Sequence, residues 1–427
     1  MALEKYCKGK YTSGNPLYIE ESFLTGKTNE TGQSIIFIPE INKQVGSYNT
    51  VLFVAISAYI ILKYEREIIN RVSFQSPELD YIFSVKQALT NPSWSEDGTI
   101  TVGTKSFSET TSEKQSFIVD GKSVFVYFGI SWSTSDKIRS APLSVQSTMF
   151  FEIEPTSDYV FIYRLWRIAK IFIQYLCYRR DIHLQSADLA APYDDEKHEK
   201  FATLYIIGET DESDAETMDK GRYICQSHIK GCEGKLLSDI ASDKLYIHHL
   251  PTSYQAGRHI DAARFVMITA AFEWEFHRGY PEGIPKNPER IRIEDTATAA
   301  IDDLINASTG ELKKKYKFLK KLIKSDSLQN EIEHIGRDLS GLIDLFGNHL
   351  YAINDEKLVY SDMGQRLADQ RNHFAHGDLE KDFIGLSLLD LVYMEYIVYA
   401  LQLHYYGVEP QNIRKAVNEL FHCRFAL

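Results

Sequence analysis

The spacing of apolar residues changes along the chain, and this change constrains the fold more than any other feature. Up to about residue 150, β-branched and aromatic residues alternate with polar ones in short runs, which turn sequences such as SGNP and NPSWSEDG separate. Beyond PTSYQAG (251–257), apolar residues recur every three or four positions, as in amphipathic helices. We therefore predict an α+β protein with a β-rich domain over residues 1–250, sandwich-like or barrel-like, and an all-α helical bundle over residues 251–427.

The predicted elements follow from the same patterns. Strands are expected at LYIEESFL, SIIFIPEI, residues 51–64, REIINRVSF, GTITVGT, KQSFIVDG, KSVFVYFGIS and FATLYII. SPELD is interpreted as a turn, and strands are expected to continue up to the boundary near residue 250. Residues 157–180 predict a helix that is capped by Ser157 or Asp158. In the second half, helices are expected over 259–279, 289–324 (one or two helices), about 326–350, 361–378, 383–406 and 410–422.

Charge limits how this protein can bind nucleic acid. The 427 residues carry 47 basic and 59 acidic side chains, for a formal charge of −12. Such a chain repels a phosphate backbone over most of its surface, so any RNA must be held by a local basic patch. The lysine-rich run at residues 313–324 is the best candidate for such a patch, and the alternative is a solvated helix face.

Cysteine usage and hydropathy indicate the compartment. The five cysteines are odd in number and scattered, which argues against a disulfide framework and fits a reducing environment. The longest apolar run, residues 51–64, is too short to span a membrane and ends near Lys63. We expect a cytoplasmic protein that does not span a membrane.

Cys225, His228 and Cys232 lie close enough in sequence to bind one zinc ion, with His248 or His249 as a fourth ligand. The spacing includes only one ligand pair of the usual kind, and no second pair follows. The alternative is a strand and a turn whose cysteines are buried, and we expect no metal or other cofactor.

A short motif late in the chain combines groups that can cleave a phosphodiester. Arg371, Asn372 and His376 lie within two helical turns in the sequence QRNHFAHG. A guanidinium binds phosphate oxygens through two parallel hydrogen bonds, and an imidazole exchanges protons near neutral pH. Together they suit RNA, whose 2′-OH is an internal nucleophile. The alternative is structural: Arg371 caps a helix end or pairs with Asp362 or Asp369, and His376 is a satisfied residue at the end of a helix.

Spacing alone does not select this motif, because residues 222–228 and the pair Arg366 and His373 fit the same interval. The sequence around His376 is distinctive, since Gly377 follows it and glycine favours a helix C-terminus. We therefore expect Arg366→Ala and His373→Ala to harm activity much less than changes at Arg371 and His376.

Two segments resemble a known superfamily of nucleases. RNHFAHG and the apolar stretch FIGLSLLDLVYMEYIVYALQLHYYG resemble the catalytic motif and following helix of the HEPN superfamily of metal-independent ribonucleases. RFVMITAAFEWEFHRGYP (264–281) resembles the helix that opens the HEPN region of ApeA-like bacterial anti-phage proteins, and INRVSFQSPELDYIF (69–83) is similar to their N-terminal domain. The resemblance implies that Arg371 and His376 are the catalytic pair and that Asn372 is the polar residue of the motif.

The resemblance also implies a function. We expect an endoribonuclease that acts in abortive infection, with RNA as substrate, tRNA among the candidates, and a phage-derived trigger. Glu273 and His277, four apart in EWEFHR, form either a second acid–base element or an ordinary helix-supporting pair. The rival function is a non-catalytic dimerisation scaffold whose β-rich domain binds a protein.

The geometry of a helix predicts the assembly. Arg371 and His376 lie about 140° apart around an ideal helix, so one copy forms half of a cleft. A second copy related by a two-fold axis completes the site, so we expect a homodimer through the helical domain.

Overall fold

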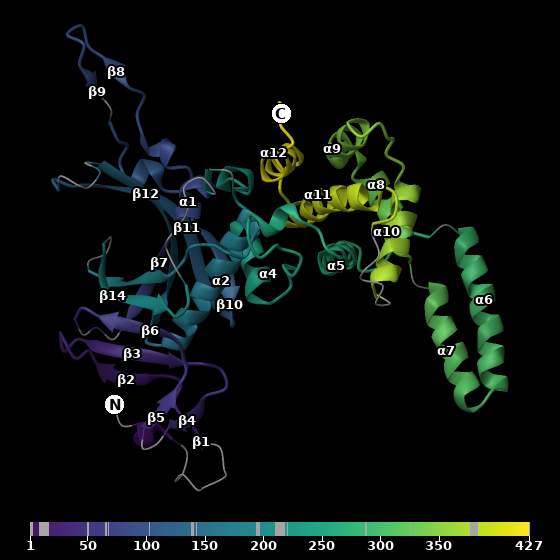
Figure 1. Ribbon diagram of the computed structural model, residues 1–427, viewed down its shortest axis with the longest axis horizontal. Coiled ribbons are helices and arrows are strands. Elements are labelled where there is room, and N and C mark those ends of the chain that lie inside the picture. Colours follow the sequence, from purple (N-terminus) through teal and green to yellow (C-terminus); the bar gives the residue numbers. More distant parts are fainter. Residues whose placement is uncertain are drawn as a thin grey trace. The chain divides into compact units, whose positions relative to one another are not determined.

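The chain has an α+β architecture, with a sheet-rich region at residues 17–206 and a helical region at residues 226–420 (Figure 1). This computed structural model describes residues 3–7, 17–48, 51–64, 66, 68–101, 103–137, 141, 143–193, 197–209, 218–219, 221–286, 288–324, 326–375 and 383–426.

Contacts divide the chain into two compact units. We name Met1–Leu245 with Leu250–Gly257 the β unit, and Tyr246–His249 with Arg258–Leu427 the helical unit. The division falls between residues 245 and 258, in the part of the chain where the sequence predicted a boundary near residue 250.

The β unit is built on one antiparallel sheet. Nine of the described strands form it in the order β10-β11-β12-β7-β13-β14-β6-β3-β2, while β1, β4 and β5 form a small sheet and β8 pairs with β9. The strands are β1 (Leu17–Tyr18), β2 (Leu24–Lys27), β3 (Ser34–Pro39), β4 (Gln44–Tyr48), β5 (Val51–Val54), β6 (Ile56–Leu62), β7 (Ile69–Gln75), β8 (Ser93–Trp94), β9 (Ile100–Thr101), β10 (Gln115–Val119), β11 (Lys122–Thr134), β12 (Leu143–Thr156), β13 (Ser186–Pro192) and β14 (His198–Ile206). The predicted sandwich-like or barrel-like arrangement thus takes the form of an open sheet, whose edges are β10 and β2.

Helix α2 (Tyr159–Cys177) packs on this sheet. Asp158 caps its N-terminus, as one of the two predicted caps, by accepting a hydrogen bond from the Phe161 N–H at 3.0 Å. Phe172 lies 6.4 Å from Phe128 of β11, ring centroid to ring centroid, and both side chains are buried. The amphipathic pattern of residues 157–180 therefore corresponds to a helix that covers a sheet face.

Several sequence predictions for the β unit were wrong in detail. The 51–64 run is two strands in different sheets, β5 and β6, rather than one. SPELD opens the helix α1 (Pro77–Ile82) rather than a turn, and strands β12 and β13 were not predicted. The last of the described strands ends at Ile206, well before residue 250, and the segment that follows contains the helix α4 (Glu233–Ala241).

The helical unit contains eight of the described helices, which cover most of its length. They are α5 (Ala262–Gly279), α6 (Pro288–Ala307), α7 (Gly310–Lys324), α8 (Leu328–Asp338), α9 (Ser340–Ala352), α10 (Tyr360–Ala375), α11 (Ser387–Tyr406) and α12 (Pro410–Leu420). The single helix predicted over about 326–350 is two helices, because the chain bends between α8 and α9 at Leu339. None of the described helices is long and apolar enough to cross a membrane.

Helix α11 is the centre of the helical unit. It packs against α5, α9, α10 and α12, and it is buried around nearly its whole circumference. The apolar character of this segment, which the sequence shows on all sides, is therefore satisfied largely within one copy of the chain.

Helices α8 and α10 approach each other closely at two glycines. A Cβ atom at Gly364 of α10 would lie 2.8 Å from the Cα atom of Gln329 on α8. A Cβ atom at Gly336 of α8 would lie 2.4 Å from the ring of Tyr360 on α10. These two positions accept only glycine without a shift of one helix.

Candidate active site

The predicted catalytic motif begins on α10, where this helix packs against α5 and α8. The buried side of α10 includes Met363, Leu367 and Phe374, and the Phe374 ring meets the ring of Phe265 on α5 edge-on at 5.4 Å. Arg371 is half-buried and Asn372 is exposed. The apolar side of α10 thus anchors the helix, and Arg371 and Asn372 lie outside that core.

Arg371 forms an ion pair with Glu273 of α5. Its Nη1 atom lies 2.6 Å from Glu273 Oε1, and the two side chains keep 33% and 27% of their surface exposed. Asp369, one of the two predicted partners, instead accepts a hydrogen bond from Gln365 at 2.9 Å. An ion pair this accessible contributes at most about 1 kcal/mol to stability, so the guanidinium remains able to exchange its partner for a phosphate.

Glu331 of α8 is a proton-exchanging group beside this pair that sequence reasoning missed. Its side chain is 2% exposed, and one carboxyl oxygen lies 3.7 Å from Nε2 of His277. Burial, and then the negative charges of Glu273 and Asp326, raise the pKa of Glu331 to about 8, against the opposing charge of Arg371. A carboxyl group with this pKa is largely protonated at neutral pH and can donate a proton.

Glu273 and His277 therefore have different partners, although they are four residues apart on α5. Glu273 pairs with Arg371, whereas His277 lies against Glu331. The two interpretations of this pair, an acid–base element or a helix-supporting contact, stay open, and the partners of Glu273 and His277 show a cluster that α5, α8 and α10 build together.

Gln370 connects the end of α10 to the start of α11. Its buried side-chain oxygen accepts hydrogen bonds from the Ile384 N–H at 2.7 Å and from the Ser387 hydroxyl at 3.1 Å. The residue next to Arg371 thus fixes the chain that leads into α11. Nothing in the local sequence distinguishes this glutamine from an ordinary surface residue.

His376 and Gly377 lie outside the described residues, as does all of 376–382. The pairing of His376 with Arg371 and Asn372 therefore stays a prediction.

Arg366, from the competing Arg–His pair, has a structural role. Its Nε and Nη2 atoms each lie 2.7 Å from an oxygen of Asp390, which is fully buried in α11 and also accepts a hydrogen bond from the Tyr351 hydroxyl. Removing Arg366 would leave a buried carboxyl without its cation, which costs about 3–5 kcal/mol. The expectation that Arg366→Ala harms activity less than Arg371→Ala stays a prediction, and the structure adds that Arg366→Ala should destabilise the fold.

The structure brings together two of the predicted zinc ligands in the β unit. Cys225 and His228 bring a sulfur and a ring nitrogen within 4.8 Å of each other. In the part of the chain that the structure describes, Cys232 does not join them at that distance; it lies at the N-terminus of α4. His248 and His249 belong to the helical unit. The predicted strand is absent from residues 221–232, where Gln226–His228 form a short 3-10 helix.

The basic side of α2 is largely engaged in ion pairs. Arg164 lies 2.9 Å from Asp120, and Lys170 pairs with Glu209. Together with Arg167 they border two cavities of about 590 and 410 Å³ beside the sheet. These ion pairs give Arg164 and Lys170 carboxylate partners, which favours a solvated helix face over an RNA contact.

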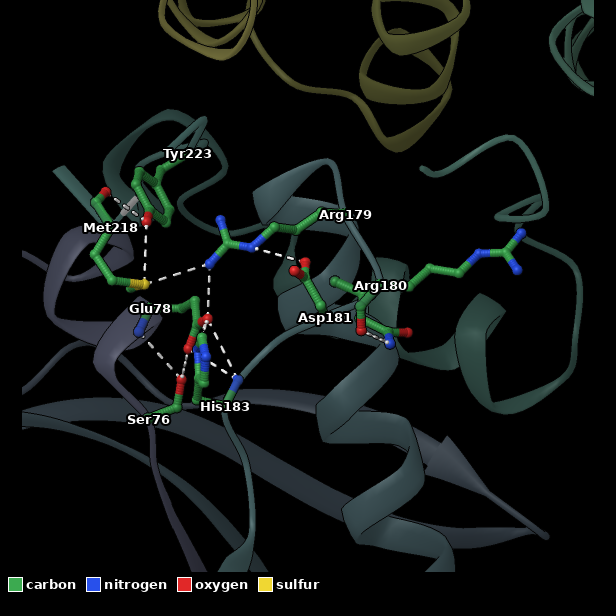
Figure 2. Close-up of polar contacts among 9 residues, drawn as sticks. Ser76, Glu78, Arg179, Arg180, Asp181, His183, Met218 and Tyr223 are labelled. Atoms are coloured by element: carbon green, nitrogen blue, oxygen red, sulfur yellow. Dashed lines mark hydrogen bonds and ion pairs between the residues drawn. The ribbon is translucent and has the colours of Figure 1, made fainter. Parts of the chain in front are cut away.

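A buried polar cluster ties the β unit together (Figure 2). Figure 2 shows the Glu78 carboxylate between Ser76, Arg179 and His183, and the distances are 2.6 Å to Ser76 Oγ, 2.7 Å to Arg179 Nη2 and 2.7 Å to His183 Nδ1. Arg179 also lies 3.2 Å from Asp181. Because each oxygen of Glu78 already has donors, the cluster joins α1 to the chain after α2 and offers a substrate no free carboxylate.

This cluster predicts how stability depends on pH. The hydrogen bond to Glu78 raises the pKa of His183, although burial opposes the shift. Burial alone would raise the pKa of Glu78, but hydrogen bonds from His183 and Ser76 and the charge of Arg179 hold it below its ordinary value. The His183 contribution is complete below about pH 6.5 and is lost as the pH rises through the folded pKa. The Glu78 contribution is complete above about pH 4.3 and is lost as the pH falls through its folded pKa.

We therefore expect the urea midpoint of unfolding to fall as the pH rises from about 6.5 through the raised pKa of His183. His183→Asn should flatten this fall while lowering the midpoint at acidic pH. An unchanged slope in the His183→Asn chain would assign the pH dependence to another group.

Comparison of the chain with family models, curated proteins and solved structures finds no match. The geometry of the site therefore has to support any function by itself.

Proposed function

We propose that the chain is a metal-independent endoribonuclease of the HEPN kind, which acts in anti-phage defence by abortive infection. One observation carries the proposal. The two segments on which the resemblance rests, EWEFHR and RNHFAHG, are 98 residues apart at Glu273 and Arg371, and these two residues form an ion pair. A sequence resemblance at two separate places thus corresponds to one site in space.

The proposed chemistry uses the 2′-OH of RNA. His376 acts as general base or general acid: as the base it takes the proton of this hydroxyl, and as the acid it gives a proton to the leaving 5′ oxygen. The 2′ oxygen attacks the adjacent phosphorus while the bond to the 5′ oxygen breaks. The leaving oxygen receives a proton, and the products are a 2′,3′-cyclic phosphate and a 5′-OH. Arg371 stabilises the charge that builds on the phosphate oxygens, and Asn372 orients Arg371 or one of those oxygens. Glu273 holds the guanidinium in place until a phosphate replaces it.

The proposed assembly is a homodimer in which two motifs face each other across a two-fold axis, so that each site contains two arginines and two histidines. The β unit then acts as sensor, inhibitor or specificity element, and a phage-derived molecule is the trigger. RNA is the proposed substrate, tRNA is among the candidates, and the proposed location is the cytoplasm.

Metal independence gives the first test. The purified protein should cleave total RNA in excess EDTA and leave 2′,3′-cyclic phosphate ends, because the proposed chemistry needs only side chains and the 2′-OH. The matched control is the Arg371→Ala protein purified in the same way, which excludes a contaminating ribonuclease. Cleavage that stops in EDTA and returns with magnesium or manganese would contradict the mechanism.

The rival function predicts another outcome. A scaffold protein cuts no RNA with or without a metal, even when it is isolated from cells in which its expression is toxic. Toxicity that persists in the Arg371→Ala and His376→Ala chains would favour the scaffold.

A further inference from the structure

Helices α6 and α7 form a hairpin that packs mainly against itself. They are joined by Ser308 and Thr309 and lie side by side (Figure 1). Among the described side chains of both helices, Ile305 is the one that is buried, and each helix packs extensively against the other, with no comparably extensive contact to another described element. Helices with so little buried surface are marginal in water. Within the described residues, the rest of the chain therefore covers little of the hairpin surface.

Seven large apolar side chains among the described residues of the hairpin keep 43% to 59% of their surface exposed: Ile291, Ile293 and Leu304 on α6, and Leu312, Phe318, Leu319 and Leu322 on α7. Five of them, Ile293, Leu304, Leu312, Phe318 and Leu319, define one surface of the hairpin. On ideal helices, Ile293 and Leu304 lie about 90° from the side of α6 that faces α7. Leu312 and Leu319 lie about 70° from the side of α7 that faces α6, and because the helices run antiparallel this is the same side of the hairpin. Phe318 lies at the outer edge of this surface, which we call the apolar face.

The chemistry of this face selects the kind of partner. RNA would bind the lysines of α7 but would leave five large apolar side chains in water, whereas a second protein surface would bury them. Lys317 and Lys321 lie on the opposite, polar side of α7, so a basic surface exists there that does not include the apolar face.

Charge complementarity points to a second copy of the same chain. Helix α6 carries five acidic and two basic residues, whereas α7 carries seven lysines and one glutamate. A two-fold axis parallel to the hairpin would place α7 of each copy on α6 of the other, so that opposite charges meet along both contacts.

The register of the hairpin supports this arrangement. Lys320 lies 2.6 Å from Asp302, which fixes the height of α7 beside α6. Counted from this pair at 1.5 Å of rise per residue, the positions of Lys315 and Asp303 along the hairpin axis differ by about 6 Å. Both side chains are exposed and lie towards the apolar face or its rim, so each is placed to meet the other across the axis.

We propose that the α6–α7 hairpin is a self-association surface, on which two copies of this chain form a four-helix bundle through their apolar faces. This inference does not depend on the nuclease reaction, and it differs from the composite catalytic dimer, which would use the surface around Arg371.

The test is the mass of the full chain in solution, measured by light scattering. Leu319→Glu should halve the wild-type mass and weaken association by at least 10-fold, because it places a charge in the apolar face. Leu319→Ser is the milder second variant, and circular dichroism confirms that each chain is folded. The control is Lys317→Glu, which changes charge on the polar side and should leave the mass unchanged.

Charge exchange tests the pairing. Lys315→Glu and Asp303→Lys should each weaken self-association, while a mixture of the two chains should form heterodimers in which both cross-axis pairs are restored. A wild-type monomer, a mass unaffected by Leu319→Glu, or no heterodimer in the mixture would overturn the proposal. Loss of RNA binding by Lys317→Glu with loss of the dimer would identify the hairpin as an RNA surface instead. If Leu319→Glu halves the mass and the product is still a dimer, that remaining dimer is the one expected for the composite catalytic site.

Discussion

Arg371→Ala is expected to lower RNA cleavage by at least about 10²-fold while it changes the free energy of unfolding by less than about 1 kcal/mol. The two effects differ because Arg371 would stabilise charge in the transition state, yet in the folded chain it forms only a partly exposed ion pair with Glu273. Cleavage rates and urea unfolding of the same preparation measure both quantities.

Controls on the same helix make the result specific. Gln365→Ala removes an exposed polar side chain of α10 and should leave cleavage unchanged. Arg371→Lys keeps the charge without the planar fork, so it should restore part of the rate at most. If Arg371→Ala lowers stability by several kcal/mol and cleavage only in proportion, Arg371 is a structural residue.

His376→Ala should reduce cleavage by about 10²–10⁴-fold, as removal of a proton carrier does. Mixing the Arg371→Ala and His376→Ala chains tests the composite site, because each subunit then supplies the group that the other lacks. Full activity of a monomer would contradict this site.

Glu78→Leu is expected to destabilise the β unit by about 3–5 kcal/mol, because it removes the buried carboxylate of Arg179 and leaves the half-exposed Asp181 as its remaining carboxylate partner. Arg179→Met should be destabilising as well, since Glu78 then keeps only His183 and Ser76 as side-chain donors. The double variant should recover much of the loss, because it removes both charges together.

Urea unfolding followed by tryptophan fluorescence measures these changes, since Trp94, Trp132 and Trp166 belong to the β unit. Arg66→Ala is the matched control, because its partner is Glu199 in an exposed ion pair, and it should cost less than about 1 kcal/mol. A double variant whose loss equals the sum of the single losses would show that Glu78 and Arg179 act independently.

Local patterns predicted the parts of the fold that local interactions determine. The helix over 159–177 was found because its apolar period and its cap at Asp158 lie within one short segment. Strand β12 was missed because it lies between β11 and β7, where consecutive residues such as Met149, Phe150 and Phe151 are buried and the alternation disappears. Helix α1 was missed because Ser76 and Pro77 are common both in turns and at helix starts.

In the candidate site, too, local sequence predicted some of the residues, while the packing of helices determines the others. The motif around Arg371 and the segment around Glu273 were identified in the sequence, but their ion pair depends on the packing of α5 against α10. Glu331 and Gln370 could not be found, since a buried carboxyl and a buried amide are defined by the helices around them. Whether His376 completes the site stays a prediction.

The close approach of α8 and α10 at Gly364 has a consequence for mutational tolerance. Gly364 lies seven residues before Arg371, about two turns away on the same side of α10. Any side chain at this position would meet the backbone of Gln329, so one helix would have to move. A displacement of about 1 Å is enough to cost a catalytic group most of its effect. In a library of single substitutions we expect Gly364 to be as intolerant as the proposed catalytic residues Arg371 and His376, although it has no side chain that could take part in the proposed reaction.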